Sequence, residues 1–125
     1  MKYLLDTNLI IDAVGGCSPA MTMLETVVSD EWVGYSAITR LELFGYPELT
    51  AVEEEALRIV VGEMNEMAVT SSVVDRAIKI RRSVRIKTPD AIIAATALEA
   101  DAVLVTRNED DFKSVDGLTV INPWS

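Results

Sequence analysis

The sequence predicts an α/β fold in which helices cover both faces of a parallel sheet. Short apolar runs typical of buried strands recur along the chain, and stretches with apolar residues at helical spacing separate them. Strands that alternate with amphipathic helices favour a parallel sheet, because parallel neighbours need a long crossover between them. The sequence does not give the strand order.

The expected elements follow one another along the whole chain. Strands are expected over Lys2 to Leu5, Trp32 to Tyr35, Met67 to Val69, Ala102 to Val105 and Leu118 to Ile121. Helices are expected over Leu9 to Val14, Pro19 to Val28 and Ala37 to Phe44, and from Thr50, Ser71 or Ser72, and Thr88 onward. Thr50 and Glu53 have the spacing of a capping box, and Thr88 before Pro89 predicts a helix cap.

Length and composition predict one domain spanning residues 1–125, because half of the residues are hydrophobic and no linker-like tract divides them. Asp6 interrupts the first apolar run, so no signal segment is expected. Ala91 to Leu98 is far shorter than the ~20 residues that a membrane span requires. With Cys17 as its only cysteine, the chain has no internal disulfide, and a cytoplasmic, reducing setting is expected.

The absence of histidine restricts the possible chemistry. It excludes Ser-His-Asp and Cys-His catalysis as well as histidine-ligated metals. Carboxylate and amide oxygens remain, and these suit hard cations such as Mg²⁺ or Mn²⁺.

The net charge of −9 argues at first against a nucleic-acid partner. The charge is uneven, however, because six of the eleven basic residues fall in one stretch: Arg76, Lys79, Arg81, Arg82, Arg85 and Lys87. A polarised surface and ordinary solvated helix faces both account for this clustering.

Asp6 follows the first predicted strand directly, and Thr106 to Asn108 follow a later one. Ligands of open parallel sheets gather outside the carboxyl ends of the strands, so these residues are expected to share one edge. The alternative is that Asp6 or Thr7 caps the next helix.

Three further acids can each be explained in two ways, by a structural role alone or by membership of a functional site. Glu42 has helical spacing with Ile38 and Leu41, which places it on an apolar stripe or at the border of one, reaching solvent. Asp90 opens the most apolar helix, where the helix dipole alone would stabilise it. Asp111 is either a turn residue or a member of the same cluster. Together, these acids and Asp6 would repel one another without a cation, so a divalent ion and metal-assisted phosphodiester hydrolysis are expected.

Five segments of the sequence resemble the PIN-domain ribonucleases, especially the VapC-type toxins of toxin–antitoxin pairs. In order, they are "LLDTNLIID", "SAITRLELFGY", "KTPDAIIAATAL", "LVTRNEDDF" and "INPW". The resemblance implies a three-layer α/β/α PIN-like domain around the parallel sheet and an Mg²⁺- or Mn²⁺-dependent endoribonuclease. It also implies products with 3′-hydroxyl and 5′-phosphate ends.

The resemblance assigns site residues by motif. Asp6, Glu42 and Asp90 become the principal catalytic acids and metal ligands, with Thr7 and Asn8 supporting Asp6. Some family members have a fourth acid where this chain has Asn108, an amide that adds no negative charge. Asn108 as a metal ligand and Asp111 as a catalytic acid are therefore both retained as candidates.

Partners follow from the same resemblance. RNA is expected to contact a basic rim, for which the candidates are Arg81, Arg82, Arg85, Lys87 and Arg107, with Arg76 and Lys79 beside them. A cognate antitoxin and a homodimer are also implied. The apolar residues Tyr46, Leu49, Val52 and Ile59 are expected in the core, with a dimer or antitoxin surface as the alternative.

Two rival functions remain open at this stage. A phosphatase of the haloacid dehalogenase type would use Asp6 as its nucleophile, but it needs a second aspartate where Asn8 stands. Acid-stable phosphate on Asp6 would favour that class. The other rival is a PIN-like module that binds RNA or protein without cutting.

Overall fold

The computed structural model describes residues 1–29 and 32–124, which form a five-stranded parallel sheet in the order β3-β2-β1-β4-β5. The strands are β1 (Lys2–Leu5), β2 (Trp32–Ser36), β3 (Asn65–Met67), β4 (Val103–Val105) and β5 (Val120–Ile121). The helices are α1 (Thr7–Val14), α2 (Ser18–Val28), α3 (Ala37–Phe44), α4 (Ala51–Val61), α5 (Ser71–Ser83), α6 (Thr88–Ala100) and α7 (Glu109–Phe112). The predicted α/β class is confirmed.

The central strand β1 pairs with β2 on one side and with β4 on the other. The chain builds outward from β1 to β3 and then returns to add β4 and β5 on the other side. The strand order therefore reverses between β1 and β4. In open parallel sheets, the crevice outside the strand ends at such a reversal is where ligands bind.

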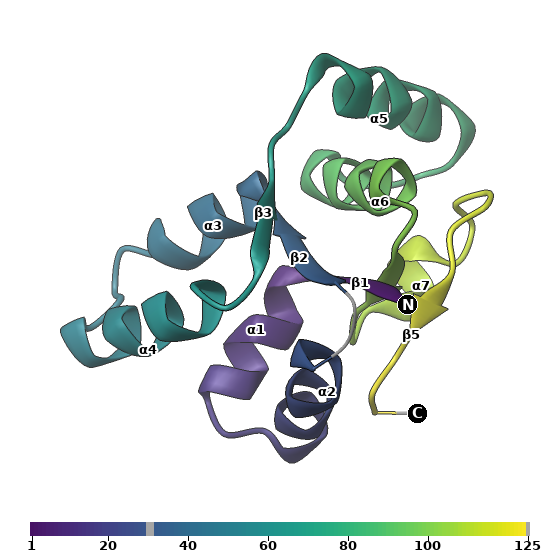
Figure 1. Cartoon of the computed structure of the whole chain (residues 1–125). Helices are drawn as coiled ribbons and strands as arrows, with labels where there is room; N and C mark the ends of the chain where they lie inside the picture. Colours follow the sequence, from purple (N-terminus) through teal and green to yellow (C-terminus); the bar gives the residue numbers. More distant parts are fainter. Residues whose placement is uncertain (30–31, 125) are drawn as a thin grey trace.

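Helices cover both faces of the sheet in three layers. Figure 1 shows α5 and α6 above the sheet and α1 and α2 below it, with α3 and α4 to the left. Successive residues of a strand point to opposite faces, so Leu4 packs under α5 and α6 whereas Leu5 packs against α1. Helix α6 is buried around most of its circumference because it lies between the sheet and α5.

Several helix and strand ends confirm the predicted signals, and others correct them. The Thr50–Glu53 capping box forms, with each backbone amide bonded to the other side chain. Lys87 occupies the cap position of α6, and Thr88, the first helical residue, accepts a hydrogen bond from Arg81 instead. The strand expected over Met67 to Val69 is instead β3, two residues earlier, because it must pair with β2 in register.

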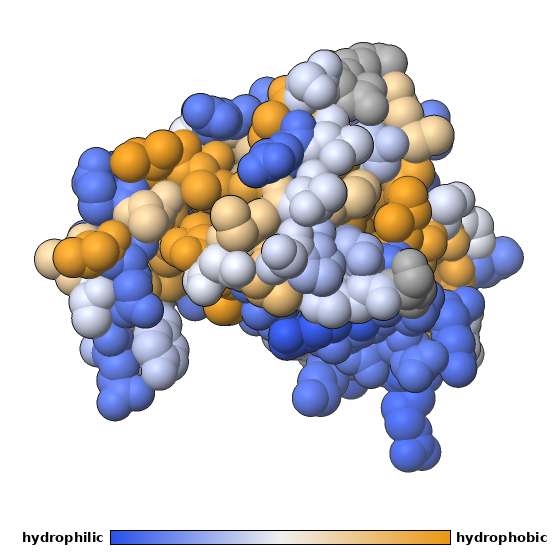
Figure 2. All heavy atoms as spheres, turned by 90° about the horizontal axis from the view of Figure 1, so that it is seen from below, coloured by the Kyte–Doolittle hydropathy of each residue, from blue (hydrophilic) through white to orange (hydrophobic). Residues whose placement is uncertain are grey.

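The prediction of a core position is wrong for three of the four apolar residues in and before α4, which are Tyr46, Leu49, Val52 and Ile59. Val52 is 81% exposed, Ile59 60% and Tyr46 52%, and Leu49 is half-buried. The residues that α4 buries are Leu57 and Val61. Figure 2 shows apolar residues gathered on the left of the lower face, the side on which Figure 1 draws α3 and α4. The surface interpretation of these residues therefore stays open.

No helix within residues 1–29 and 32–124 combines enough length with enough apolar character to cross a bilayer.

Gly34 is required by the close contact between β2 and β3. A Cβ atom there would lie 2.7 Å from the carbonyl oxygen of Asn65 and 2.3 Å from the ring of Trp32. We expect Gly34→Ala to lower the free energy of unfolding by about 1–3 kcal/mol, because the strands must separate to accept the methyl group. Urea denaturation measures this change.

Gly15→Ala is the matched control for that substitution. Gly15 has right-handed helical dihedrals, and its added Cβ would lie 3.3 Å from the Ile11 carbonyl oxygen. It should cost clearly less than Gly34→Ala. Equal losses in the two variants would show that crowding at β2 is not the cause.

Candidate active site at the carboxyl edge of the sheet

Asp6 lies where β1 ends and α1 begins, and its side chain is only 3% exposed. One carboxylate oxygen accepts the Thr7 backbone N–H at 2.8 Å, so Asp6 caps α1. The other accepts the Thr106 hydroxyl at 2.7 Å. The capping role and the place at the shared edge, considered as alternatives from sequence, therefore occur together.

The pKa of Asp6 is raised, chiefly because burial disfavours its charged form. The hydrogen bonds from Thr106 and Thr7 oppose that shift, whereas the negative charges of Glu42 and Asp111 add to it. Acids from α1, α3 and α7 thus act on one another electrostatically.

Glu42 reaches the site through Thr7. The Thr7 hydroxyl lies 2.7 Å from the Glu42 carboxylate and 3.0 Å from the Thr39 hydroxyl. A hydroxyl has a single proton, so when Thr7 donates to Glu42, the buried Thr39 donates to Thr7. The predicted supporting role of Thr7 has a physical basis in this relay.

The apolar stripe predicted for Glu42 is incorrect. Leu41 is 69% exposed, and α3 buries Thr39 and Leu43 instead. Glu42 is exposed beside Thr39, because the helix is rotated relative to the predicted stripe. The alternative of a border position describes it better.

Asp90 lies half-buried in the first turn of α6, and its pKa is raised to about 6. Burial is the main cause, followed by the negative charges of Asp6, Asp111 and Glu42, whereas Lys87 acts in the opposite direction. Four acids from four separate segments therefore share one electrostatic environment.

The same acids do not form a ready-made cage. Among residues 1–29 and 32–124, no group of three or more acidic or cysteine side chains is gathered closely enough to hold a metal ion. Asp6 is directed by Thr7 and Thr106, and Glu42 by Thr7, so each carboxylate follows its own partners. The close convergence on one pocket that the sequence predicted is thus only partial.

The donor set nevertheless fits a hard divalent cation. All four acids offer oxygen ligands, and each oxygen of Asp6 retains a lone pair beyond its hydrogen bond. Their negative charges repel one another, and a divalent ion would neutralise that excess charge. The acids with the most freedom to adjust are the exposed ones, Glu42 and Asp111.

Thr106 was expected at this edge of the sheet from the sequence, but no role in the site was predicted for it. Fully buried at the end of β4, it donates to Asp6 and accepts the backbone N–H of Asn108 at 3.0 Å. Its position in "LVTRN" directly after the strand was the available signal. Asn108 occupies the N-cap position of α7 without a capping hydrogen bond from its side chain, and half-buried Asn8 follows Thr7 in α1.

Part of the predicted basic rim lies beside the acids. Arg81, Arg85 and Lys87 line one hollow together with Asp90 and Asp111.

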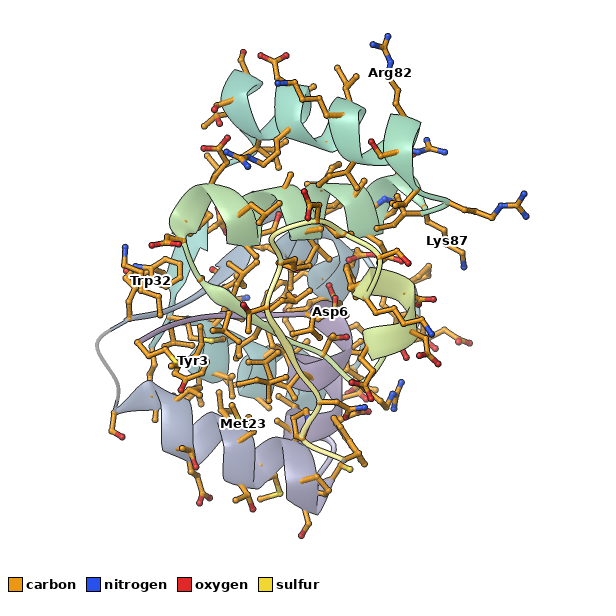
Figure 3. All side chains as sticks on the ribbon, turned by 90° about the vertical axis from the view of Figure 1, so that its right-hand side faces the viewer. Tyr3, Asp6, Met23, Trp32, Arg82 and Lys87 are labelled. Atoms are coloured by element: carbon orange, nitrogen blue, oxygen red, sulfur yellow. The ribbon has the colours of Figure 1, made fainter. Side chains whose placement is uncertain are left out.

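Other basic candidates lie elsewhere. Figure 3 shows the Arg82 side chain pointing away from the body of the protein and from Asp6. Arg76 and Lys79 line a different hollow, and Arg76 pairs with Glu99 at 3.1 Å. Arg107 pairs with Asp12 at 2.8 Å.

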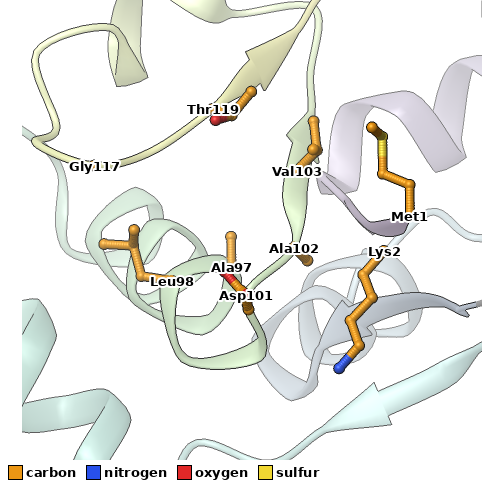
Figure 4. A pocket seen from close by; sticks show the side chains of 9 residues that line it. All are labelled: Met1, Lys2, Ala97, Leu98, Asp101, Ala102, Val103, Gly117 and Thr119. Carbon is orange, nitrogen blue, oxygen red and sulfur yellow. The ribbon is translucent and has the colours of Figure 1, made fainter.

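A second polar hollow lies at the opposite end of the sheet. Figure 4 shows it near the start of β1 and β4, where Lys2, Asp101 and Thr119 contribute polar atoms. It is therefore separate from the strand ends that carry Asp6 and Thr106.

Comparison with known proteins agrees with this geometry. The sequence profile of the PIN domain matches residues 3–118. No curated protein sequence matches the chain. Among solved structures, a toxin–antitoxin complex from Klebsiella pneumoniae contains a chain 31% identical, with 97% of both chains covered and a TM-score of 0.82.

Two further structures are similar over nearly the whole chain. FitAcB from Neisseria gonorrhoeae matches at 26% identity and a TM-score of 0.80, with 98% of each chain covered. VapBC2 from Rickettsia felis, solved with a DNA fragment from its promoter, shares the fold at 23% identity, with a TM-score of 0.85 and 98% of each chain covered. The chain belongs to the PIN domain family, as its ordered motifs predict.

Proposed function

We propose that this chain is a divalent-cation-dependent endoribonuclease and the toxin of a toxin–antitoxin pair. The observation that carries the proposal is the position of buried Asp6 directly after β1, where the strand order reverses, with Glu42, Asp90 and Asp111 near enough for their charges to act on this cluster. The 31% identity to a chain of a toxin–antitoxin complex supports the biological setting.

In the proposed site, Asp6 and Asp90 would hold the cation most directly, and Glu42 would act directly or through water. Asn108 and Asp111 are further candidates. When bound, Mg²⁺ or Mn²⁺ polarises a phosphate and lowers the pKa of a water. Thr106 and Thr7 orient the carboxylates of Asp6 and Glu42. One acid of the cluster would accept the proton that water loses as it attacks phosphorus. The bond between phosphorus and the 3′-oxygen would break, and that oxygen would take up a proton from solvent, leaving 3′-hydroxyl and 5′-phosphate ends. Asn8 would support Asp6.

RNA would reach these acids across the basic hollow. Arg81, Arg85 and Lys87 line it beside Asp90, so they would offer phosphate donors close to the proposed cation site. Aromatic residues make up 6% of the sequence, which favours contact with the backbone over stacking of many bases.

This chain has a groove that a segment of the proposed antitoxin would fill. It is lined by Glu42, Glu53 and apolar side chains of α1, α3, α4 and the segment between α3 and α4: Ile11, Val14, Leu43, Tyr46, Leu49 and Leu57. An amphipathic segment with one basic side chain would cover this groove and neutralise Glu42. In the proposed homodimer, exposed Val52 and Ile59, two turns apart on α4, would be covered by the second copy.

The first test is cleavage of RNA in Mg²⁺. Asp6→Asn and Asp90→Asn should each lower the rate by at least about 100-fold, because each removes a charge that the cation requires. Glu25→Gln, on exposed α2, is the control and should cut as the wild type does. Equal cleavage by wild type and Asp6→Asn would point to a contaminant, and binding of RNA without cleavage would favour the non-cutting module.

The raised pKa of Asp90 predicts how stability depends on pH without a cation. The folded protein binds the proton of the Asp90 carboxyl more tightly than the unfolded chain does. Protonated Asp90 therefore contributes fully to the free energy of unfolding below pH 3.8, and this contribution is lost as pH rises through about 6. At pH 7 in EDTA, Asp90→Asn should therefore be more stable than the wild type by about 1 kcal/mol, a value reduced for solvent screening.

Urea denaturation of both proteins from pH 3.5 to 7 measures this difference. The advantage of Asp90→Asn should shrink toward pH 4, and Mg²⁺ at pH 7 should reduce it by stabilising the wild type. A variant that is no more stable than the wild type at pH 7 would contradict the proposed charge repulsion.

The basic hollow predicts a difference between two neighbouring arginines. Arg85 lines the hollow and Arg82 points away from it. Arg85→Gln should weaken RNA binding and reduce the slope of log affinity against log salt by about 0.7, the value for one lost phosphate contact on a single strand. Arg82→Gln should change neither. Equal effects of the two variants would mean that RNA does not use this hollow.

A further inference from the structure

Arg107 lies next to the proposed site, but its guanidinium is held by other parts of the protein. Its Nη1 donates to an oxygen of Asp12 at 2.8 Å. The same guanidinium lies 5.9 Å from the centre of the Trp124 ring, within the range of a cation–π interaction. The Asp12 side chain is 17% exposed, so this ion pair is partly shielded from solvent.

The backbone of Arg107 is held by the C-terminal segment as well. The Asn122 side-chain amide donates to the Arg107 carbonyl at 3.3 Å and to the Glu109 carboxylate at 3.2 Å. The side-chain oxygen of Asn122 accepts the Trp124 backbone N–H at 2.9 Å. Side chain and backbone of Arg107 are thus fixed at the same time.

These contacts join the segments that carry the site. Thr106, immediately before Arg107, donates to Asp6, and Asn108, immediately after it, donates its N–H to Thr106. Asp12 lies on α1, the helix that Asp6 caps. A shift of the loop between β4 and α7 would therefore move the hydroxyl that orients Asp6.

We propose that Arg107 is a positioning residue: with Asp12 and Trp124, it fixes the loop so that Thr106 directs the Asp6 carboxylate toward the cation. This inference rests on the proposed function and replaces the predicted RNA contact of Arg107. Arginine suits the task because its planar guanidinium can bond a carboxylate and stack on an aromatic ring together, whereas lysine offers only a point charge.

Asp12→Asn separates this role from a direct contact with RNA. If Arg107 bound phosphate, removing the charge of Asp12 would free the Arg107 guanidinium for RNA and make the surface less negative. The KM for RNA would then fall. If Arg107 positions the loop, the same substitution weakens the ion pair and lowers both cation affinity and kcat. The two roles therefore predict changes in different quantities: KM alone for an RNA contact, and cation affinity with kcat for a positioning role.

The experiment measures Mn²⁺ affinity by titration calorimetry, together with kcat and KM for Mg²⁺-dependent RNA cleavage. Arg107→Met, Arg107→Lys and Asp12→Asn should each weaken Mn²⁺ binding by about 10-fold or more, the usual effect of losing a residue that orients a metal ligand. Their kcat should fall in proportion, with KM changed by less than about two-fold.

Arg76→Met is the matched control. Arg76 is 45% exposed and pairs with Glu99 at 3.1 Å, against 47% exposure and 2.8 Å for Arg107, but it lines a different hollow. It should bind Mn²⁺ as the wild type does. Urea denaturation confirms that every variant is folded under the assay conditions.

Two results would overturn the inference. One is a raised KM in Arg107→Met with unchanged Mn²⁺ affinity, especially if Arg107→Lys restores it, because that describes an RNA contact. The other is normal Mn²⁺ affinity and kcat in all three variants. A wild type that neither binds Mn²⁺ nor cuts RNA would instead refute the proposed function itself.

Discussion

The hydrogen bond from Thr106 to Asp6 is the contact on which the candidate site depends. Asp6 is almost fully buried, and a buried carboxylate without donors would be strongly destabilising. Thr106 can supply a donor because β4 pairs directly with β1, so residues one hundred positions apart arrive at the same edge. The pairing of β4 with β1 therefore determines both the strand order at the centre of the sheet and the location of the candidate site.

The surroundings of the two principal candidate acids affect their charged forms differently. Asp6 receives hydrogen bonds from Thr7 and Thr106, which offset part of the effect of burial on its pKa. Burial, followed by the negative charges of Asp6, Asp111 and Glu42, raises the pKa of Asp90 to about 6, and Lys87 acts in the opposite direction. A protein retains such repulsion when a bound partner relieves it, and a functional site is where stability is commonly given up.

The sequence predicted where polar residues leave the strands but not how each side chain is held. Asp6 was found because a carboxylate after an apolar run is conspicuous, whereas Thr106 resembles any hydroxyl at a strand end. Helical periodicity predicted which residues of α4 share a face, but not which face packs against the rest of the protein. Leu57 turned out to be buried and Val52 exposed, because packing against α1 decides that orientation.

The net charge of −9 describes the whole surface and not the hollow beside Asp90. At physiological salt, exposed charges more than about 8 Å apart are largely screened from one another. A phosphate at the hollow would therefore interact mainly with the charges that line it, and much less with the acids of α4. Three basic side chains, Arg81, Arg85 and Lys87, line it against two acids, Asp90 and Asp111. An acidic protein can thus present a basic approach to an acidic centre, and overall charge alone does not argue against RNA as its substrate.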